Sequence, residues 1–162
     1  SGQMILTNGP YLEVSTSEGV LAGGDIRASG GEVNLKVKVQ CTDWIDIDRV
    51  QILVNGSQRK DLNFTRKDNK EMFLNGRVKF DQDLKVKLSQ DSHLIVVAYG
   101  EGFNLSKGFG SSTQSAMNPC AYNNPIFVDV DGGGVKPSGD TLGYPLPVKG
   151  LTADKVAELL KR

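Results

Sequence analysis

The 162-residue chain contains one histidine, two cysteines and no excess of charge of either sign. One His and two Cys leave few ligands for a zinc or transition-metal catalytic centre. Lys and Arg together number 19, as do Asp and Glu, which argues against a nucleic-acid binder or a polybasic membrane anchor, because both need a cationic surplus. The longest apolar run, at 94–98, is far too short for a membrane span. The composition therefore indicates one domain that is poorly equipped for catalysis.

Hydrophobic residues make up 38% of the chain, which is enough to bury a core, and they recur with a period of two. The segment 32–41 alternates throughout. Its apolar members are Val33, Leu35, Val37, Val39 and Cys41. A pleated strand would place them on one face and the intervening charged and amide residues on the other. Such a strand is typical of a sandwich sheet that is covered on one side only.

Similar patterns predict further short strands. They lie at 11–15, 50–54, 58–62, 78–88, 93–99 and 126–130. Asn55 and Gly56, which tolerate positive φ, suit a type I′ hairpin turn between two of them. The strand at 93–99 is apolar on both faces and is expected at the centre of a sheet. Because no helical pattern separates the strands, the predicted fold class is all-β, an antiparallel sandwich of seven to nine strands resembling the immunoglobulin or fibronectin type III architecture.

Two stretches do not fit the strand pattern. Residues 100–123 are rich in Gly, Ser and Asn and are predicted to form a long loop across one end or edge of the sandwich. Residues 151–162 are predicted to be a short C-terminal helical tail with Thr152 as N-cap and one apolar face. A helix of about ten residues is marginal alone, so the tail is expected to dock on the sandwich or on a neighbouring domain or chain. The predicted β-sandwich domain therefore spans 1–150.

Few single residues offer reactive chemistry. His93, the only histidine, has no nucleophile motif beside it and is expected to make a structural hydrogen bond at a strand entry. Cys41 and Cys120 could form a disulfide in an exported protein, but we expect free thiols, with Cys41 in the core. Trp44 lies among three aspartates and could stack on a sugar ring. Its large apolar area instead favours a place at the end of the core.

The segment 129–140 resembles a calcium-binding loop. It has carboxylates at its first, third and last positions and a glycine at its sixth, and Ca²⁺ prefers hard oxygen ligands on a glycine-bent loop. The candidate ligands are Asp129, Asp131 and Asp140. Against this interpretation, the fifth position is Gly133, the last carboxylate is the shorter Asp, and no helices flank the loop. The alternative is a Gly-rich turn in which the aspartates accept backbone N–H groups.

The same region carries a family resemblance. NPIFVDVDG at 124–132 is followed by GDTLG at 139–143 and PLPV at 145–148. Shorter matching pieces are NGP at 8–10, DRVQ at 48–51, VNG at 54–56, FTR at 64–66, KFD at 79–81 and HLIVVA at 93–98. Together they make the chain resemble the C-terminal part of CehA/McbA-type metallohydrolases, which belong to the PHP-like metal-dependent phosphoesterases and their amidohydrolase relatives.

The resemblance implies an accessory β-sandwich domain. In such proteins a catalytic PHP domain precedes the sandwich and holds two or three divalent metal ions through His and acidic ligands. With one His, this chain cannot supply that cluster, so the resemblance assigns it no catalytic residue and no cofactor. The expected partner is the N-terminal catalytic domain of the same protein, and homo-oligomer contacts are a second expectation. The resemblance also implies export of the parent protein, with the targeting signal upstream of this region.

Two further functions stay open. The sandwich could be a carbohydrate- or surface-binding module, assisted by Ca²⁺. The aromatic residues for stacking on a sugar would then be Trp44, Tyr99, Phe103, Phe109 and Tyr122. An independent enzyme would need a polar constellation in one cleft, and the sequence shows no nucleophile–base pair. The first prediction is therefore a non-catalytic accessory domain of a larger metal-dependent hydrolase, with no nucleic acid as partner and no membrane span.

Overall fold

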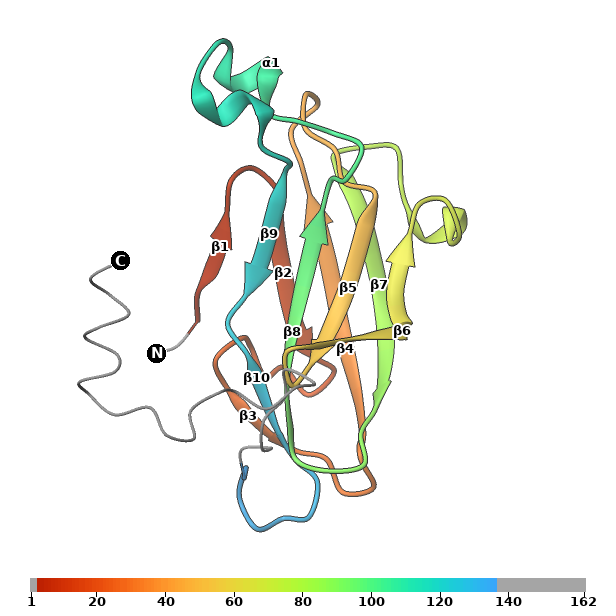
Figure 1. Ribbon diagram of the computed structural model, residues 1–162. Coiled ribbons are helices and arrows are strands. Elements are labelled where there is room, and N and C mark those ends of the chain that lie inside the picture. The colour runs from red at the N-terminus through yellow and green to blue at the C-terminus, as the bar shows by residue number, and fades with distance from the viewer. Residues whose placement is uncertain (1–2, 137–162) are drawn as a thin grey trace, which may run out of the picture.

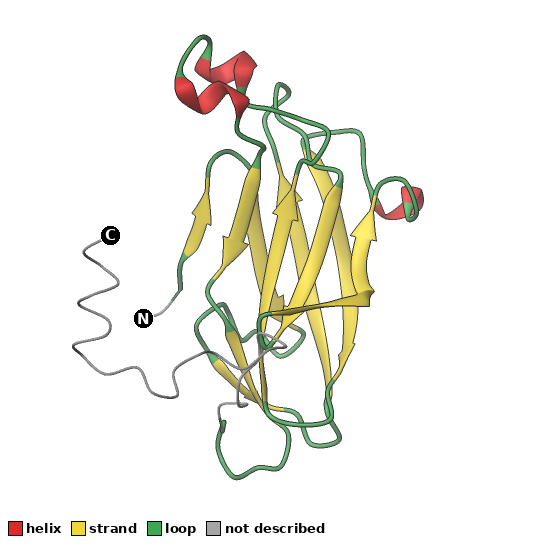
Figure 2. Cartoon of the chain, in the orientation of Figure 1, coloured by secondary structure: helices red, strands yellow, loops and turns green. Residues whose placement is uncertain are grey.

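The computed structural model describes residues 3–136, which form two β-sheets packed face to face (Figure 1, Figure 2). All strand pairs but one are antiparallel, so the predicted all-β sandwich is confirmed. The helical tail predicted at 151–162 and the candidate ligand Asp140 lie outside the described residues. None of the helices within the described range is long and apolar enough to cross a membrane.

The smaller sheet, sheet B, contains three antiparallel strands in the order β2-β4-β7. They are β2 (Tyr11–Thr16), β4 (Glu32–Gln40) and β7 (Val78–Lys87). The alternation predicted for the middle strand is confirmed, because its four valine and leucine residues are at most 2% exposed while Glu32 and Lys36 face solvent. This pattern buries one face of sheet B against the other sheet and leaves the other face in water.

The larger sheet, sheet A, is built around one central strand. Its strands are β1 (Ile5–Thr7), β3 (Asp25–Arg27), β5 (Arg49–Val54), β6 (Ser57–Thr65), β8 (Ser92–Tyr99), β9 (Cys120–Asn123) and β10 (Ile126–Asp129). As predicted, β8 is central: β5 pairs with one of its edges, and β9 and β10 share the other. Next to β5 lies β6, whereas β1 pairs with β9 and β3 runs parallel to β10. Sheet A thus faces β2-β4-β7 in an immunoglobulin-like arrangement.

The turn between β5 and β6 follows the sequence prediction. Asn55 has φ 52° and Gly56 has φ 76°, so both central residues adopt the left-handed conformation of a type I′ turn. Val54 and Ser57 pair directly across it. The two residues therefore fix the register of this hairpin through local backbone geometry alone.

The prediction that all of 100–123 is a loop is wrong at its C-terminal end. Residues 120–123 form β9, and residues 100–119 form a connection that contains α1 (Ser106–Phe109) and the 3₁₀ turn η2 (Thr113–Ala116). A second 3₁₀ turn, η1 (Lys70–Met72), precedes β7. The connection 100–119 stands at one end of the sandwich, called here the loop-bearing end (Figure 1). Ten strands form within residues 3–136 because β1, β3 and β9, of only three or four residues, add to those predicted.

Phe80 of β7, which is 0% exposed, is the largest fully buried side chain among residues 3–136. Its ring lies 5.2 Å from the ring of Phe73 in edge-to-face contact and 6.3 Å from the ring of Phe64, measured between centroids. Phe64 comes from β6 and Phe73 follows η1. One side chain of sheet B therefore contacts both sheet A and the loop-bearing end.

Candidate functional site

The two sheets present different outer faces to their surroundings. On sheet B the outer face is charged: Lys36 lies opposite Asp83, and Lys38 opposite Asp81, across the β4–β7 pair. Opposite charges in facing positions stabilise neighbouring strands and keep a sheet face hydrated. The outer face of sheet B is therefore typical of a sandwich sheet that is exposed to water.

The outer face of sheet A is apolar over β1, β9 and the middle of β8, whereas Arg49 and Gln51 of β5, opposite Tyr99 and Val97, make it polar beside this patch. Along β8 the side chains alternate between buried and half-exposed positions, and the half-exposed ones point outward. Six outward residues are apolar and half-exposed or exposed, and they define the apolar outer face: Leu6, Leu53, Ile95, Val97, Tyr122 and Phe127. Strand pairing makes the surface continuous, because Leu6 lies opposite Tyr122, Tyr122 opposite Val97, and Ile95 opposite Leu53. A grouping of this kind is typical of an interaction surface.

At the loop-bearing end one carboxylate balances two cations. Arg66 Nη2 donates a hydrogen bond to Asp46 Oδ1 over 2.8 Å, and the Nζ of buried Lys79 lies 3.6 Å from the same oxygen. The guanidinium of Arg66 also lies 5.5 Å from the centroid of the Phe73 ring. These contacts join the chain before β5, the segment after β6 and the start of β7. The cluster therefore stabilises the end of the sandwich.

Polar side chains also fix the connection 100–119. The carboxylate of Asp48 accepts the N–H groups of Glu101 at 2.7 Å and Gly102 at 2.9 Å. The side-chain amide of Asn118 donates to three carbonyl groups within 100–103, and its oxygen accepts the hydroxyl of Tyr99 at 2.9 Å. The connection is thus held by specific hydrogen bonds at both of its ends.

Trp44 is exposed at this end, and the prediction that it fills the end of the core is wrong. Its side chain is 42% exposed and packs against Gly108 of α1. A Cβ atom at Gly108 would lie 2.2 Å from Cζ3 of the indole, so a side chain there would displace the ring. The connection 100–119 therefore supports a tryptophan at the surface, 64 residues away in the sequence.

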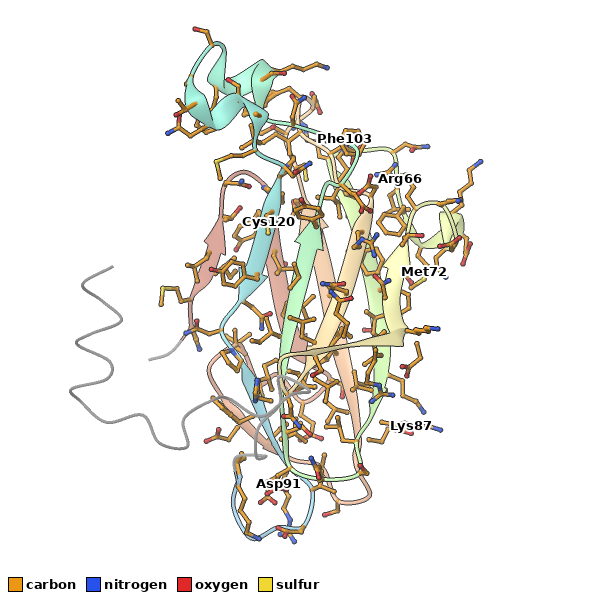
Figure 3. The ribbon with its side chains drawn as sticks, in the orientation of Figure 1. Arg66, Met72, Lys87, Asp91, Phe103 and Cys120 are labelled. Atoms are coloured by element: carbon orange, nitrogen blue, oxygen red, sulfur yellow. The ribbon has the colours of Figure 1, made fainter. Side chains whose placement is uncertain are left out.

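Asp129 and Asp131, the two described aspartates of the predicted calcium loop, lie at the opposite end of the sandwich (Figure 3). Asp129 accepts the N–H groups of Gly132 and Gly134, and Asp131 pairs with Lys136 over 2.8 Å. A third carboxylate, that of Asp91, lies within 4.8 Å of both, and Figure 3 shows it far from Phe103 and Arg66. These contacts match the alternative of a hydrogen-bonded turn. Binding of Ca²⁺ by Asp129, Asp131 and Asp140 stays a prediction.

Asp91 holds the loop after β10 to the start of β8. Its two carboxylate oxygens accept the N–H groups of Val130 at 2.8 Å and of Lys136 at 2.9 Å. These two hydrogen bonds hold the pKa of the Asp91 carboxyl below its ordinary value of 3.8. A depressed pKa in the folded state means that the unfolded state takes up the proton first as the pH falls. The contribution of Asp91 to stability is therefore present above pH 3.8 and is lost on acidification through the folded-state pKa.

We expect Asp91→Asn to lower the melting temperature near neutral pH, because a neutral amide cannot accept both N–H groups as the carboxylate does. We also expect its melting temperature to fall less steeply than that of the wild type between about pH 5 and pH 3, since the titrating group is gone. Thermal denaturation followed by circular dichroism at a series of pH values measures both effects. Identical acid profiles for the two proteins would contradict the role assigned to Asp91.

The other predicted residues occupy separate places. His93 points outward from β8, where its ring lies 6.4 Å from that of Phe127 between centroids, and its backbone N–H donates to Asn55. Both cysteines are free thiols. Burial raises the pKa of the Cys41 thiol to about 11, and burial also raises that of Cys120 at the start of β9. Cys41 therefore belongs to the core, as predicted.

The five aromatic residues proposed for sugar stacking come from two regions of the fold. At the loop-bearing end, Phe103 and Phe109 are exposed in the connection that supports Trp44. Tyr99 and Tyr122 are instead on adjacent strands of sheet A, where Tyr99 is tied to Asn118 and Tyr122 belongs to the apolar outer face. The sequence did not single out Tyr11, which is 54% exposed beside Trp44 in one groove. Its place at the start of a strand gave no functional signal.

No family model, curated protein or solved structure matches this chain. The resemblance to CehA/McbA-type metallohydrolases therefore stays a prediction from the sequence. A two-layer β-sandwich is compatible with many functions, so the fold does not identify one. The apolar outer face of sheet A and the surface around Trp44 are the two features from which a function can be argued.

Proposed function

We propose that this chain is a non-catalytic accessory β-sandwich domain that packs on a neighbouring domain of the same protein through the apolar outer face of sheet A. The observation that carries the proposal is the contrast between the outer faces of the two sheets. Sheet B places paired charges outward, whereas sheet A places six apolar side chains there. Polar residues of β5 flank this group, and a contiguous exposed apolar group rimmed by polar residues is typical of an interaction surface.

Covering this face would release water from apolar surface, which is the main favourable term in most protein association. Tyr122 and Leu6 are 42% and 41% exposed, so much of their area is still available for burial. Tyrosine is enriched at interfaces because its ring is apolar and its hydroxyl can keep a polar partner. The residues of this face therefore suit a permanent contact with another domain.

A neighbouring domain of the same protein is favoured as the occupant by the position of β1. This strand lies at the edge of sheet A and contributes Leu6 to the apolar outer face. A domain that preceded Gln3 in the polypeptide would enter the sandwich beside this face, so the linker would hold the two surfaces together at high effective concentration. The family resemblance supports the same order, with a metal-dependent catalytic domain before the sandwich.

The proposal is tested by hydroxyl-radical footprinting of the natural polypeptide that contains the upstream domain, with this chain as the reference. We expect oxidation of Tyr122 to fall several-fold in the longer polypeptide, because its ring becomes covered. Tyr11, which is 54% exposed on sheet B, is the matched control and should be oxidised equally in both. Equal oxidation of Tyr122 in the two proteins would refute packing through this face.

Two further measurements separate the proposal from its competitors. If Tyr122 of this chain became protected as its concentration rose, a second copy would be the occupant and the proposal would be wrong. This chain is also expected to hydrolyse no p-nitrophenyl phosphate with added Mn²⁺ or Zn²⁺, since the resemblance places the metal ligands in the upstream domain. Metal-dependent turnover by the pure chain would contradict the non-catalytic role.

A further inference from the structure

A groove of about 500 Å³ lies at the loop-bearing end, on the side of sheet B. The side chains that matter here are Tyr11, Gln40, Thr42, Asp43, Trp44 and Arg77. Tyr11 and Gln40 are paired residues of β2 and β4, and the others belong to the segments that follow β4 and precede β7. The groove is therefore on the other sheet from the apolar outer face, and both surfaces can be occupied at the same time.

One part of the groove is an aromatic platform. Trp44, whose indole packs on Gly108, is 42% exposed, and Tyr11 is 54% exposed in the same groove. The hydrophobic effect alone would bury a tryptophan of this size. Here the close approach of Gly108 holds it at the surface, so the ring is ordered before a ligand arrives, which reduces the entropy lost on binding.

The other part of the groove is polar. Asp43 and Arg77 have side chains that are 80% and 82% exposed, and the charged atoms lie 3.8 Å apart. At this distance the pair is loose, and in water it contributes little to stability. The carboxylate and the guanidinium thus remain able to accept and donate hydrogen bonds to a ligand, and Gln40 adds an amide that makes only a 3.4 Å contact with Glu13.

We infer that this groove binds a carbohydrate, with a sugar ring stacked on Trp44 and its hydroxyl groups bonded by Asp43 and Arg77. A pyranose has one apolar C–H face and a rim of vicinal hydroxyl groups, so it needs an aromatic platform flanked by both a donor and an acceptor. Charged side chains make the stronger hydrogen bonds to such hydroxyls. A proline-rich peptide also binds aromatic grooves, but it presents few groups that would use the exposed carboxylate and guanidinium together.

The test begins with the intact chain on an array of plant, bacterial and animal glycans. The glycan that gives the strongest signal is then titrated by calorimetry, and the emission of Trp44 is recorded, since this is the only tryptophan in the chain. We expect binding to shift the emission of Trp44. Trp44→Ala should weaken the affinity at least about tenfold, and Arg77→Ala about tenfold, because each removes a direct contact with the sugar.

Two variants separate a specific site from general destabilisation. Gly108→Ala should change the Trp44 emission of the free protein and weaken binding, although residue 108 does not touch the sugar. Phe103→Ala alters another exposed aromatic residue of the loop-bearing end and should leave the affinity unchanged. A proline decamer is titrated in the same way. The inference is overturned if no glycan binds, if Trp44→Ala binds the selected glycan as tightly as the wild type, or if the decamer is the only ligand that binds. Each result is independent of whether sheet A packs on a neighbouring domain.

Discussion

Replacing Phe80 with alanine is expected to lower the free energy of unfolding by about 4 kcal/mol, within the range for large-to-small changes of buried phenylalanine. The side chain is fully buried, and its ring contacts those of Phe64 and Phe73. Its removal leaves a cavity where both sheets and the segment after η1 meet, and the close-packed core can fill it only in part. Urea denaturation at equilibrium measures the loss as a lower midpoint with an unchanged m value.

The matched control for this experiment is Phe103→Ala. Phe103 is 36% exposed in the connection 100–119, so its truncation should cost less than about 1 kcal/mol. A similar loss of stability in both variants would contradict the role assigned to the buried ring of Phe80. A changed m value for Phe80→Ala alone would instead point to an altered denatured state.

Asp46→Asn is expected to destabilise the protein by about 3 kcal/mol, the lower end of the cost of leaving a buried charge without its partner. The substitution keeps the shape of the side chain but removes the one carboxylate within residues 3–136 that pairs with both Arg66 and Lys79. The desolvation of Lys79 would then be uncompensated. The loss of the carboxylate would also leave Arg66 less well compensated, because its Nε is already buried without a hydrogen-bond partner among residues 3–136.

A second substitution identifies the cause. Lys79→Met removes the buried charge, so the double variant Asp46→Asn/Lys79→Met should regain most of the stability lost by Asp46→Asn. As a control, Asp61→Asn breaks a surface pair with Arg59 and should change the free energy of unfolding by less than about 1 kcal/mol. Equal losses for Asp46→Asn and Asp61→Asn, measured by urea denaturation, would contradict the charge-balancing role of Asp46.

The parts of the fold that could be predicted are those that local sequence determines. The alternation of β4 and the turn at Asn55 and Gly56 are properties of consecutive residues, and both formed as expected. By contrast, β1 and β3 have three residues each and exist because β9 and β10 pair with them. No pattern of period two can be detected in three residues.

An irregularity in strand pairing explains why the charge cluster at the loop-bearing end was not predicted. Strict alternation along β7 would put Lys79 on the opposite face from Phe80, yet both side chains are buried. The register of β4 and β7 shifts between Val39 and Gln40, and this irregularity coincides with the buried lysine. A bulge adds a residue to one strand and redirects the neighbouring side chains. The charge cluster with Asp46 was therefore invisible in the sequence.

The surface features depended on contacts between distant residues. Trp44 was expected in the core from its size, but its environment is decided by Gly108. Asp129 and Asp131 were recognised from their spacing, whereas Asp91 joins them from the turn before β8. The sequence did offer one signal for this residue, since Asp91 interrupts the apolar pattern between two strands. Tertiary packing, which spacing rules do not represent, determined the rest.

The pairing of β1 with β9 also affects when this part of the sheet can fold during synthesis. The strand at 5–7 finds its partner at 121–123, and Asn8 exchanges hydrogen bonds with Cys120 at the same point. Closing so large a loop is entropically costly and delays the contacts at its ends. On the ribosome, β1 leaves the exit tunnel long before β9 has been synthesised. Nascent chains therefore carry Leu6 without its neighbour Tyr122 until residues 121–123 have been synthesised.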